Sequence, residues 1–221
     1  AQDFPVWQGR WDALEAYLTA IDVADDTVRA ETLRLLLASL TAFGKRQFDF
    51  FRDGFDARRY HRLDISADYP IDYVFDTTLT QVSYDTAVLE RAVQGRGADQ
   101  KLQAMALNIG DILTHLSLAP AVDSGLISPT VSMTYFQKSA DIRVIPYAPV
   151  ALVGVPRTVV ETDSIRYQNY LAVPHEAAHY VYNHGRYAER NITDYLRTLV
   201  ENAPLWLKRW LEEIFADVYG A

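Results

Sequence analysis

The stretch "VPHEAAHYVYNHG", residues 173–185, concentrates groups that could do chemistry, because it holds three of the chain's five histidines. His175 and His179 are four residues apart, and residues i and i+4 of an α-helix are neighbours at about 5–6 Å between Cβ atoms. Two imidazoles in this arrangement can bind one metal ion through nitrogens at roughly 2.0–2.1 Å. Glu176 is rotated about 100° from His175 and could take a proton from a water bound to that ion. The spacing therefore predicts a helix that carries a catalytic metal.

A catalytic zinc site needs a third protein ligand and leaves one position open for water or substrate. His184, five residues beyond His179, is one candidate. A cationic side chain in the last turn of a helix also suits the helix dipole. We favour this capping role for His184 over a role as the third ligand.

A better third ligand lies in the stretch "PLWLKRWLEEIFADVYGA", residues 204–221. Four of its residues fall on one face of a helix, at spacings i, i+4, i+7 and i+11: Trp206, Trp210, Glu213 and Asp217. Burying unpaired carboxylates is costly, so a buried face with this pattern needs a cation. We expect Glu213 to bind the metal and Asp217 to hydrogen-bond to a metal-binding imidazole. Glu212 follows Lys208 by four residues, so we expect it to be solvated and paired with that lysine.

The combination of "HEAAH" and "EIFAD" resembles the gluzincin branch of zinc metallopeptidases, over roughly residues 151–221. The pattern of that family is H-E-x-x-H followed, on a later helix, by E-x-x-x-D, often with Ala before the Asp. The resemblance implies these roles: His175, His179 and Glu213 as zinc ligands, Glu176 as general base, and Asp217 as the partner of a zinc-binding imidazole. It also implies a sheet before the active-site helix, whose edge strand binds the substrate backbone. The residues in the matching place are Ala151, Leu152, Val153 and Gly154.

The elements that must position these residues change character along the chain. Residues from about 11 to 119 read as mostly helical, with apolar residues at helical spacing in "WDALEAYLTAI" and in two longer stretches. The stretch "YPIDYVFDTTLTQVSY" is rich in β-branched and aromatic residues and is ambiguous. Three short runs of β-forming residues follow, "TVSMTYF", "DIRVIPY" and "PVALVGVP", before helical patterns return near Leu171 and after Pro204. Pro174 requires the metal-binding helix to begin within one turn of it or to kink.

This order predicts an α+β fold, in which a helical N-terminal region precedes a small sheet and a zincin-like two-helix metal site. We place these regions at residues 1–125 and 126–221, either as two domains or as one continuous domain. Outside the metal motif, His61 lies in a charged segment and is expected in solvent. Asp111 and His115 are also four residues apart, but we interpret them as an ordinary pair on a helix surface because no third ligand accompanies them.

The composition limits the partners and the kind of metal site. The chain has 221 residues and a formal net charge of −8, which disfavours binding to the phosphate backbone of nucleic acids. Because it has no cysteine, any metal must be bound by His, Asp or Glu. No apolar run reaches the roughly 18 residues needed to span a bilayer, so we expect a soluble protein without a membrane span. The chain begins "AQDFPVW" without Met or a basic-then-apolar leader, which indicates a processed chain or part of a longer one and leaves the compartment open.

Together these features predict a zinc-dependent hydrolase with one Zn²⁺ per chain, and a metallopeptidase acting on peptides or proteins fits them best. Glu176 would activate a zinc-bound water for attack on the scissile carbonyl. Two alternatives remain open. One is a zinc-binding module without catalysis that uses the helical N-terminal region for interaction. The other is a zinc amidase that acts on a non-peptide amide.

Overall fold

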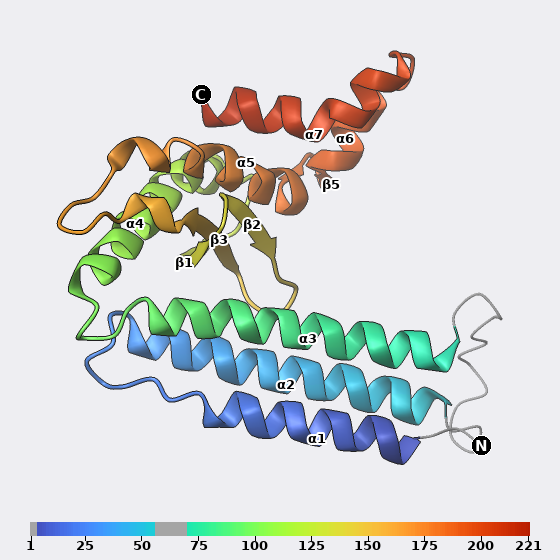
Figure 1. The fold of residues 1–221 in the computed structure, drawn as a ribbon. Helices are drawn as coiled ribbons and strands as arrows, with labels where there is room; N and C mark the ends of the chain where they lie inside the picture. Colours follow the sequence, from blue (N-terminus) through green and yellow to red (C-terminus); the bar gives the residue numbers. More distant parts are fainter. Residues whose placement is uncertain (1–3, 56–69) are drawn as a thin grey trace. The chain divides into compact units, whose positions relative to one another are not determined.

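The computed structural model describes residues 4–55 and 70–221 (Figure 1). The chain forms two compact units, Ala1–Val93 and Gln94–Ala221. His61 lies outside the described residues. The boundary between the units falls earlier than the one at residue 125 that the sequence pattern suggested, so the fourth helix belongs to the second unit.

The described residues of the first unit form three long helices, α1 (Phe4–Ala20), α2 (Ala30–Phe55) and α3 (Ile71–Gln94). Aromatic side chains fill its core: Trp11 stacks on Phe48 with ring centroids 5.6 Å apart, and Phe48 packs against Phe75 at 5.1 Å. The ambiguous stretch at residues 69–84 supplies most of α3 rather than a strand. Phe75, Leu79 and Val82 are buried there at helical spacing, so tertiary packing outweighs the local β propensity.

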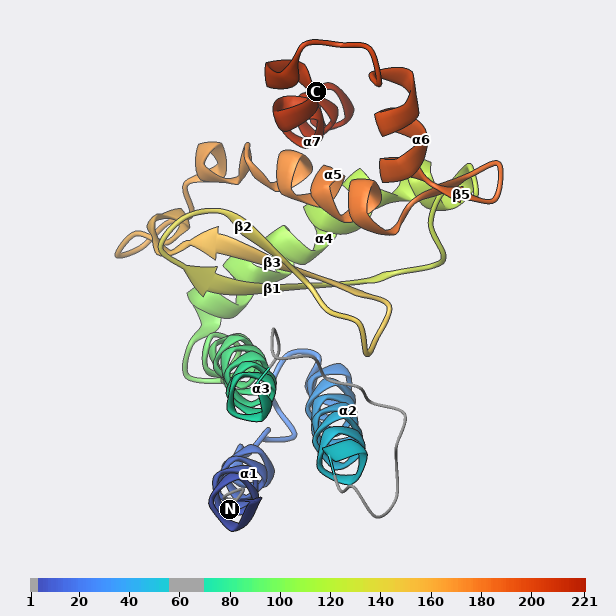
Figure 2. The same ribbon diagram turned by 90° about the vertical axis from the view of Figure 1, so that its right-hand side faces the viewer.

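The second unit holds the candidate site and combines helices with a small sheet, as the α+β expectation required. Its main elements are α4 (Lys101–Asp123), β1 (Val131–Gln137), β2 (Asp141–Val144), β3 (Val150–Pro156), α5 (Val173–His184), α6 (Ile192–Leu199) and α7 (Leu205–Gly220). Two 3-10 helices, η1 (Arg157–Val159) and η2 (Tyr167–Tyr170), lie between β3 and α5, and a short hairpin, β4 (Arg186–Tyr187) and β5 (Arg190–Asn191), precedes α6. Within this unit α5 lies between the sheet and α7 (Figures 1 and 2).

The three-stranded sheet has the order β1-β3-β2, which corrects the prediction that residues 151–154 form an edge strand. Strand β3 pairs in parallel with β1 and antiparallel with β2. Gly154, for example, lies opposite Tyr135 on one side and Asp141 on the other. Because β3 is hydrogen-bonded along both edges, Ala151, Leu152, Val153 and Gly154 cannot bind a substrate backbone. Its apolar composition is instead that of a central, buried strand.

Helices α4 and α5 cover one face of this sheet. Ala151, Val153 and Val155 are every second residue of β3, so their side chains point to the same face of the sheet. They are buried there in clusters with residues of both helices. Within the described residues, α4 is the one helix that is long and apolar enough to cross a bilayer by length and composition, with 39% of its most apolar window buried. It contacts β1 and α5, a packing that is typical of a core helix in a globular domain.

Helix α5 begins just before Pro174, as the position of that proline predicted, and ends at His184. Helix α7 packs closely against it. A Cβ atom on Gly220 would lie 2.8 Å from the backbone nitrogen of His175, so glycine is needed where the end of α7 crosses the start of α5. This close approach places the carboxylates of α7 next to the histidines of α5.

Candidate metal centre

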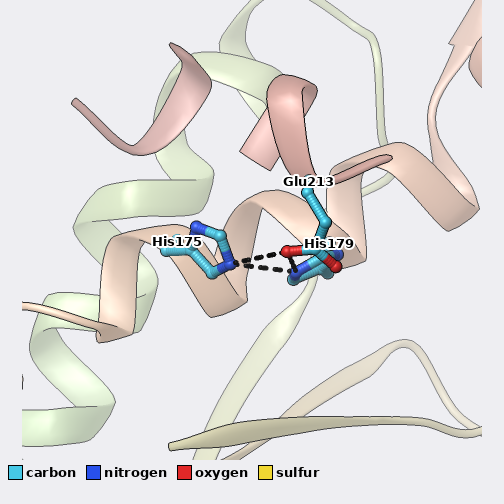
Figure 3. A group of neighbouring side chains, drawn as sticks. All are labelled: His175, His179 and Glu213. Carbon is cyan, nitrogen blue, oxygen red and sulfur yellow. Dashed lines mark hydrogen bonds and ion pairs between the residues drawn. The ribbon is translucent and has the colours of Figure 1, made fainter. Parts of the chain in front are cut away.

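Three atoms that could bind a metal converge between α5 and α7 (Figure 3). The Nε2 atoms of His175 and His179 are 3.1 Å apart. Glu213 Oε2 lies 3.5 Å from the first and 3.8 Å from the second. A point equidistant from three atoms with separations of 3.1, 3.5 and 3.8 Å lies about 2.0 Å from each, which is the length of a zinc bond to nitrogen or oxygen. The residues therefore fit the metal that the sequence motif predicted.

Hydrogen bonds on the far side of each imidazole define which nitrogens face the centre. Asp217 Oδ1 lies 3.0 Å from Nδ1 of His175, and Glu212 Oε1 lies 3.0 Å from Nδ1 of His179. A carboxylate can only accept a hydrogen bond, so we assign the proton of each ring to Nδ1. Both Nε2 atoms then present lone pairs to each other and to the Glu213 carboxylate. Three acceptors this close without a donor between them repel one another, and a cation removes the repulsion.

The position of Asp217 agrees with the role that the resemblance implied, whereas the position of Glu212 corrects our prediction. Glu212 does not stand apart in solvent; it contacts His179, and Asn183 Nδ2 also donates to its Oε1 at 3.3 Å. The two neighbouring glutamates, about 100° apart on α7, both reach histidines of α5, Glu213 at the Nε2 atoms and Glu212 at Nδ1 of His179. A sequence signal for Glu212 existed: two metal-binding imidazoles need two Nδ1 partners, and Asp217 supplies one.

The face of α7 that carries the carboxylates is open, which corrects the premise that it is buried. Trp206 and Trp210 are 61% and 60% exposed, and the Glu213 side chain is 49% exposed. Desolvation is thus not the reason that these carboxylates favour a cation. The reason is the convergence of Glu213 with two imidazole lone pairs. The openness also leaves room for water or substrate beside the three candidate ligands.

Glu176 lies on the flank of α5, one residue after His175, and is partly buried. Burial raises the pKa of its carboxyl above the ordinary value, and the charges of Asp141 and Glu213 raise it further. The nearby imidazoles of His179 and His175 act in the opposite direction. A carboxylate whose pKa is raised toward neutrality is a stronger general base, which is the property a proton acceptor for water requires.

His184 occupies the last turn of α5, as predicted, but it does not act as a cationic cap. Its ring stacks on Tyr180 at 4.2 Å between centroids, and burial lowers its pKa below the ordinary 6.5, so the imidazole is neutral at pH 7. The helix ends instead at Gly185, whose N–H donates to the carbonyl of Val181 at 2.7 Å. Nor does His184 belong to the group of candidate ligands.

Comparison of the chain with protein-family models, with curated proteins and with solved structures gave no match. A functional assignment therefore depends on the residues themselves and on their geometry.

Proposed function

We propose that the protein is a single-zinc hydrolase, and specifically a peptidase of gluzincin type. The observation that carries the proposal is the convergence of His175 Nε2, His179 Nε2 and Glu213 Oε2 around a point about 2.0 Å from each. Carboxylates behind both imidazoles support it, because such partners orient metal-binding histidines and increase their basicity. Three N and O ligands with no thiolate are a donor set that suits zinc.

In this proposal His175, His179 and Glu213 hold the zinc, and Glu176 moves the protons. When bound, zinc would lower the pKa of water and polarise a carbonyl group. Glu176 would accept a proton from the attacking water and return it to the leaving amine, a role that suits a carboxylate whose pKa is raised above the ordinary value. Asp217 and Glu212 would keep the two imidazoles in the tautomer that exposes Nε2.

Strand β2 is the part of the sheet that could bind an extended substrate. It is the outer strand on the side of α5, and within residues 94–221 no strand pairs with its outer edge. The charge of Asp141, at the start of β2, acts on the Glu176 carboxyl, so this end of the strand lies near the proposed base. A peptide added to this edge would gain main-chain hydrogen bonds and would pass beside Glu176.

The test combines metal analysis with digestion of a broad peptide library. We expect one zinc per chain after loading at neutral pH, and cleavage by the loaded protein that a chelator abolishes and zinc restores. The variants His175→Ala and His179→Ala should lose both the metal and the cleavage. Absence of stoichiometric metal would refute the proposal. Stoichiometric metal without any cleavage would favour the non-catalytic module, and hydrolysis restricted to non-peptide amides would favour the amidase.

A further inference from the structure

A pocket lies beside the C-terminal half of α5, beyond the metal centre. Its volume is about 380 Å³, and it is lined by Ile127, Ser128 and Thr130 before β1, by the loop between β2 and β3 at residues 145–149, and by Tyr180 and His184 of α5. Glu176, Tyr180 and His184 follow one another at intervals of four residues, so they lie along one side of the helix. The pocket is thus next to the candidate active site but shares no candidate metal ligand with it.

His184, whose imidazole lines the pocket, has a ring nitrogen that the described residues leave without a partner. Nε2 of His184 is buried, and no described protein group forms a hydrogen bond with it. A buried nitrogen without a partner costs free energy, and such groups in folded proteins call for an explanation. The other lining residues include two tyrosines and two prolines, Tyr147, Tyr180, Pro146 and Pro149, and none of the lining residues is Asp, Glu, Lys or Arg. These features suit a neutral, flat ligand with one hydrogen-bonding group at its tip.

Strand β2 connects the pocket to the candidate metal centre. The charge of Asp141, at the start of the strand, raises the pKa of Glu176, so this end of β2 lies near Glu176. Ile145, directly after the end of the strand, lines the pocket together with Tyr180 and His184. The strand and α5 therefore run side by side from the metal centre to the pocket. The helical rise from the midpoint of the two histidine ligands to His184 is about 10 Å, which is roughly three residues of an extended peptide.

We propose that this pocket is a distal substrate subsite that binds the side chain of a tyrosine, with the phenol hydroxyl hydrogen-bonded to His184 Nε2. Tyrosine has the flat apolar body and the neutral polar tip that the lining requires. Antiparallel pairing, which is slightly more stable per residue than parallel pairing, places this side chain two to three residues on the N-terminal side of the cleaved bond. The subsite role depends on the proposed peptidase function, whereas the binding of a phenol does not.

The first experiment measures the pocket without relying on catalysis. The full chain, free of metal and labelled with ¹⁵N at its histidines, is titrated with 4-methylphenol and, for comparison, with toluene. We expect the phenol to shift the His184 Nε2 resonance in a saturable way and toluene to bind roughly 3- to 10-fold more weakly, as for the loss of one hydrogen bond. His184→Phe keeps a ring against Tyr180 but lacks the reporter nitrogen, so its affinity is measured by titration calorimetry alongside the wild type; it should bind the phenol no more tightly than toluene. No saturable shift, or equal affinity for both probes, would overturn the proposal.

The second experiment measures the subsite with a peptide library and the zinc-loaded protein. We expect cleavage to favour Tyr over Phe at one position, two to three residues before the cleaved bond, by roughly 3- to 10-fold in kcat/KM. His184→Phe should abolish that preference and leave the cleavage of peptides with Gly at this position unchanged. An unchanged preference in the variant would overturn the subsite role. If no peptide is cleaved by the wild type, the peptidase function and the subsite role fail together, while the phenol titration still decides whether the pocket binds this chemistry.

Discussion

Two polar clusters in the second unit differ in how their charges are paired. In the closed cluster, Arg96 is fully buried; its Nη2 donates to both oxygens of Asp111 at 3.0 Å, and its Nη1 donates to the carbonyl of Thr134 at 2.7 Å. The backbone N–H of Thr134 also donates to Asp111 at 2.6 Å. In the open cluster, two imidazole lone pairs and the Glu213 carboxylate face one another at 3.1 to 3.8 Å.

The closed cluster around Arg96 and Asp111 stabilises the fold by itself, whereas the open cluster of His175, His179 and Glu213 needs a ligand. Charges that are removed from water must be paired by protein groups, and the closed cluster meets this requirement between α4 and β1. With the ring protons on Nδ1, the open cluster brings together two imidazole nitrogens and a carboxylate that all accept, so a cation between them would stabilise it. Removal of one carboxylate should therefore have opposite consequences in the two places.

The largest effect on stability is expected from Asp111→Ala. The change leaves the guanidinium of Arg96 buried without its carboxylate, which should lower the free energy of unfolding by about 3–5 kcal/mol. Urea denaturation followed by circular dichroism measures this loss. Glu201→Ala removes an exposed carboxylate and should stay within about 0.5 kcal/mol of the wild type. A loss for Asp111→Ala as small as that of the control would mean that the pair does not stabilise the fold.

Among variants that keep the metal, the largest effect on activity is expected from Glu176→Gln. The amide cannot accept a proton from water, so kcat should fall by at least roughly 10²–10⁴-fold. Zinc content, measured by atomic emission, should stay at the wild-type value because Glu176 is not among the candidate ligands. Equal hydrolysis by purified wild type and variant would remove Glu176 from the mechanism.

Glu213→Ala sharpens the comparison of the two clusters. Without metal, it should not destabilise the protein as Asp111→Ala does, because it removes an acceptor from a group that has no donor. With zinc at 100 times its Kd, the wild type should gain about 2.7 kcal/mol of stability, and the variant should gain much less. Thermal unfolding with and without zinc gives both results. A metal-free Glu213→Ala protein as unstable as Asp111→Ala would show that the open cluster supports the fold.

A smaller loss is expected at the two carboxylates behind the imidazoles. Glu212→Ala and Asp217→Asn should each weaken zinc binding by about 10–100-fold, because each leaves one imidazole without the partner that fixes its tautomer. Competition with a chelator of known affinity measures the change. Glu201→Ala again serves as control and should leave zinc affinity unchanged. Wild-type affinity in Glu212→Ala would restore the solvated role that the sequence suggested for this residue.

The smallest effect is expected from His184→Phe, and it concerns how much stability the protein loses when the pH is lowered. Burial lowers the pKa of His184 in the folded protein below the 6.5 of an ordinary histidine, so the unfolded chain binds the proton more tightly. The stability contributed by the neutral ring is complete above about pH 6.5 and decreases as the pH falls toward the lower pKa of the folded state. Burial raises the pKa of Tyr180, the ring that stacks on His184, so this phenol stays neutral over the same range. His184→Phe should thus lose less stability than the wild type between pH 7.5 and pH 5 in urea denaturation. An equal loss in both proteins would contradict this account.

Sequence spacing was sufficient for the parts of the site that depend on one helix at a time. The interval between His175 and His179 places both rings on one face of α5, and the interval between Glu213 and Asp217 places both carboxylates on one face of α7. Local pattern also located the three strands and the helices that surround them. It left the stretch at residues 70–84 ambiguous, and there the burial of one side of successive helical turns decides the conformation.

The tertiary structure decided everything that depends on how elements meet. Pairing order made β3 the central strand and β1 and β2 the outer strands, although these stretches have similar β-forming sequences. Asp111, expected on a helix surface, is buried because α4 packs against β1, where Arg96 reaches it.

The sequence by itself determined which residues of α5 and α7 could bind a metal, because helical periodicity fixes the neighbours on a single helix. It did not determine that Glu212 contacts His179, that the tryptophans of α7 are exposed, or that His184 is neutral beside a pocket. Those features depend on the distance and rotation between packed elements. Contacts between residues far apart in the chain set that distance and rotation, and Gly220 against His175 is the clearest of them.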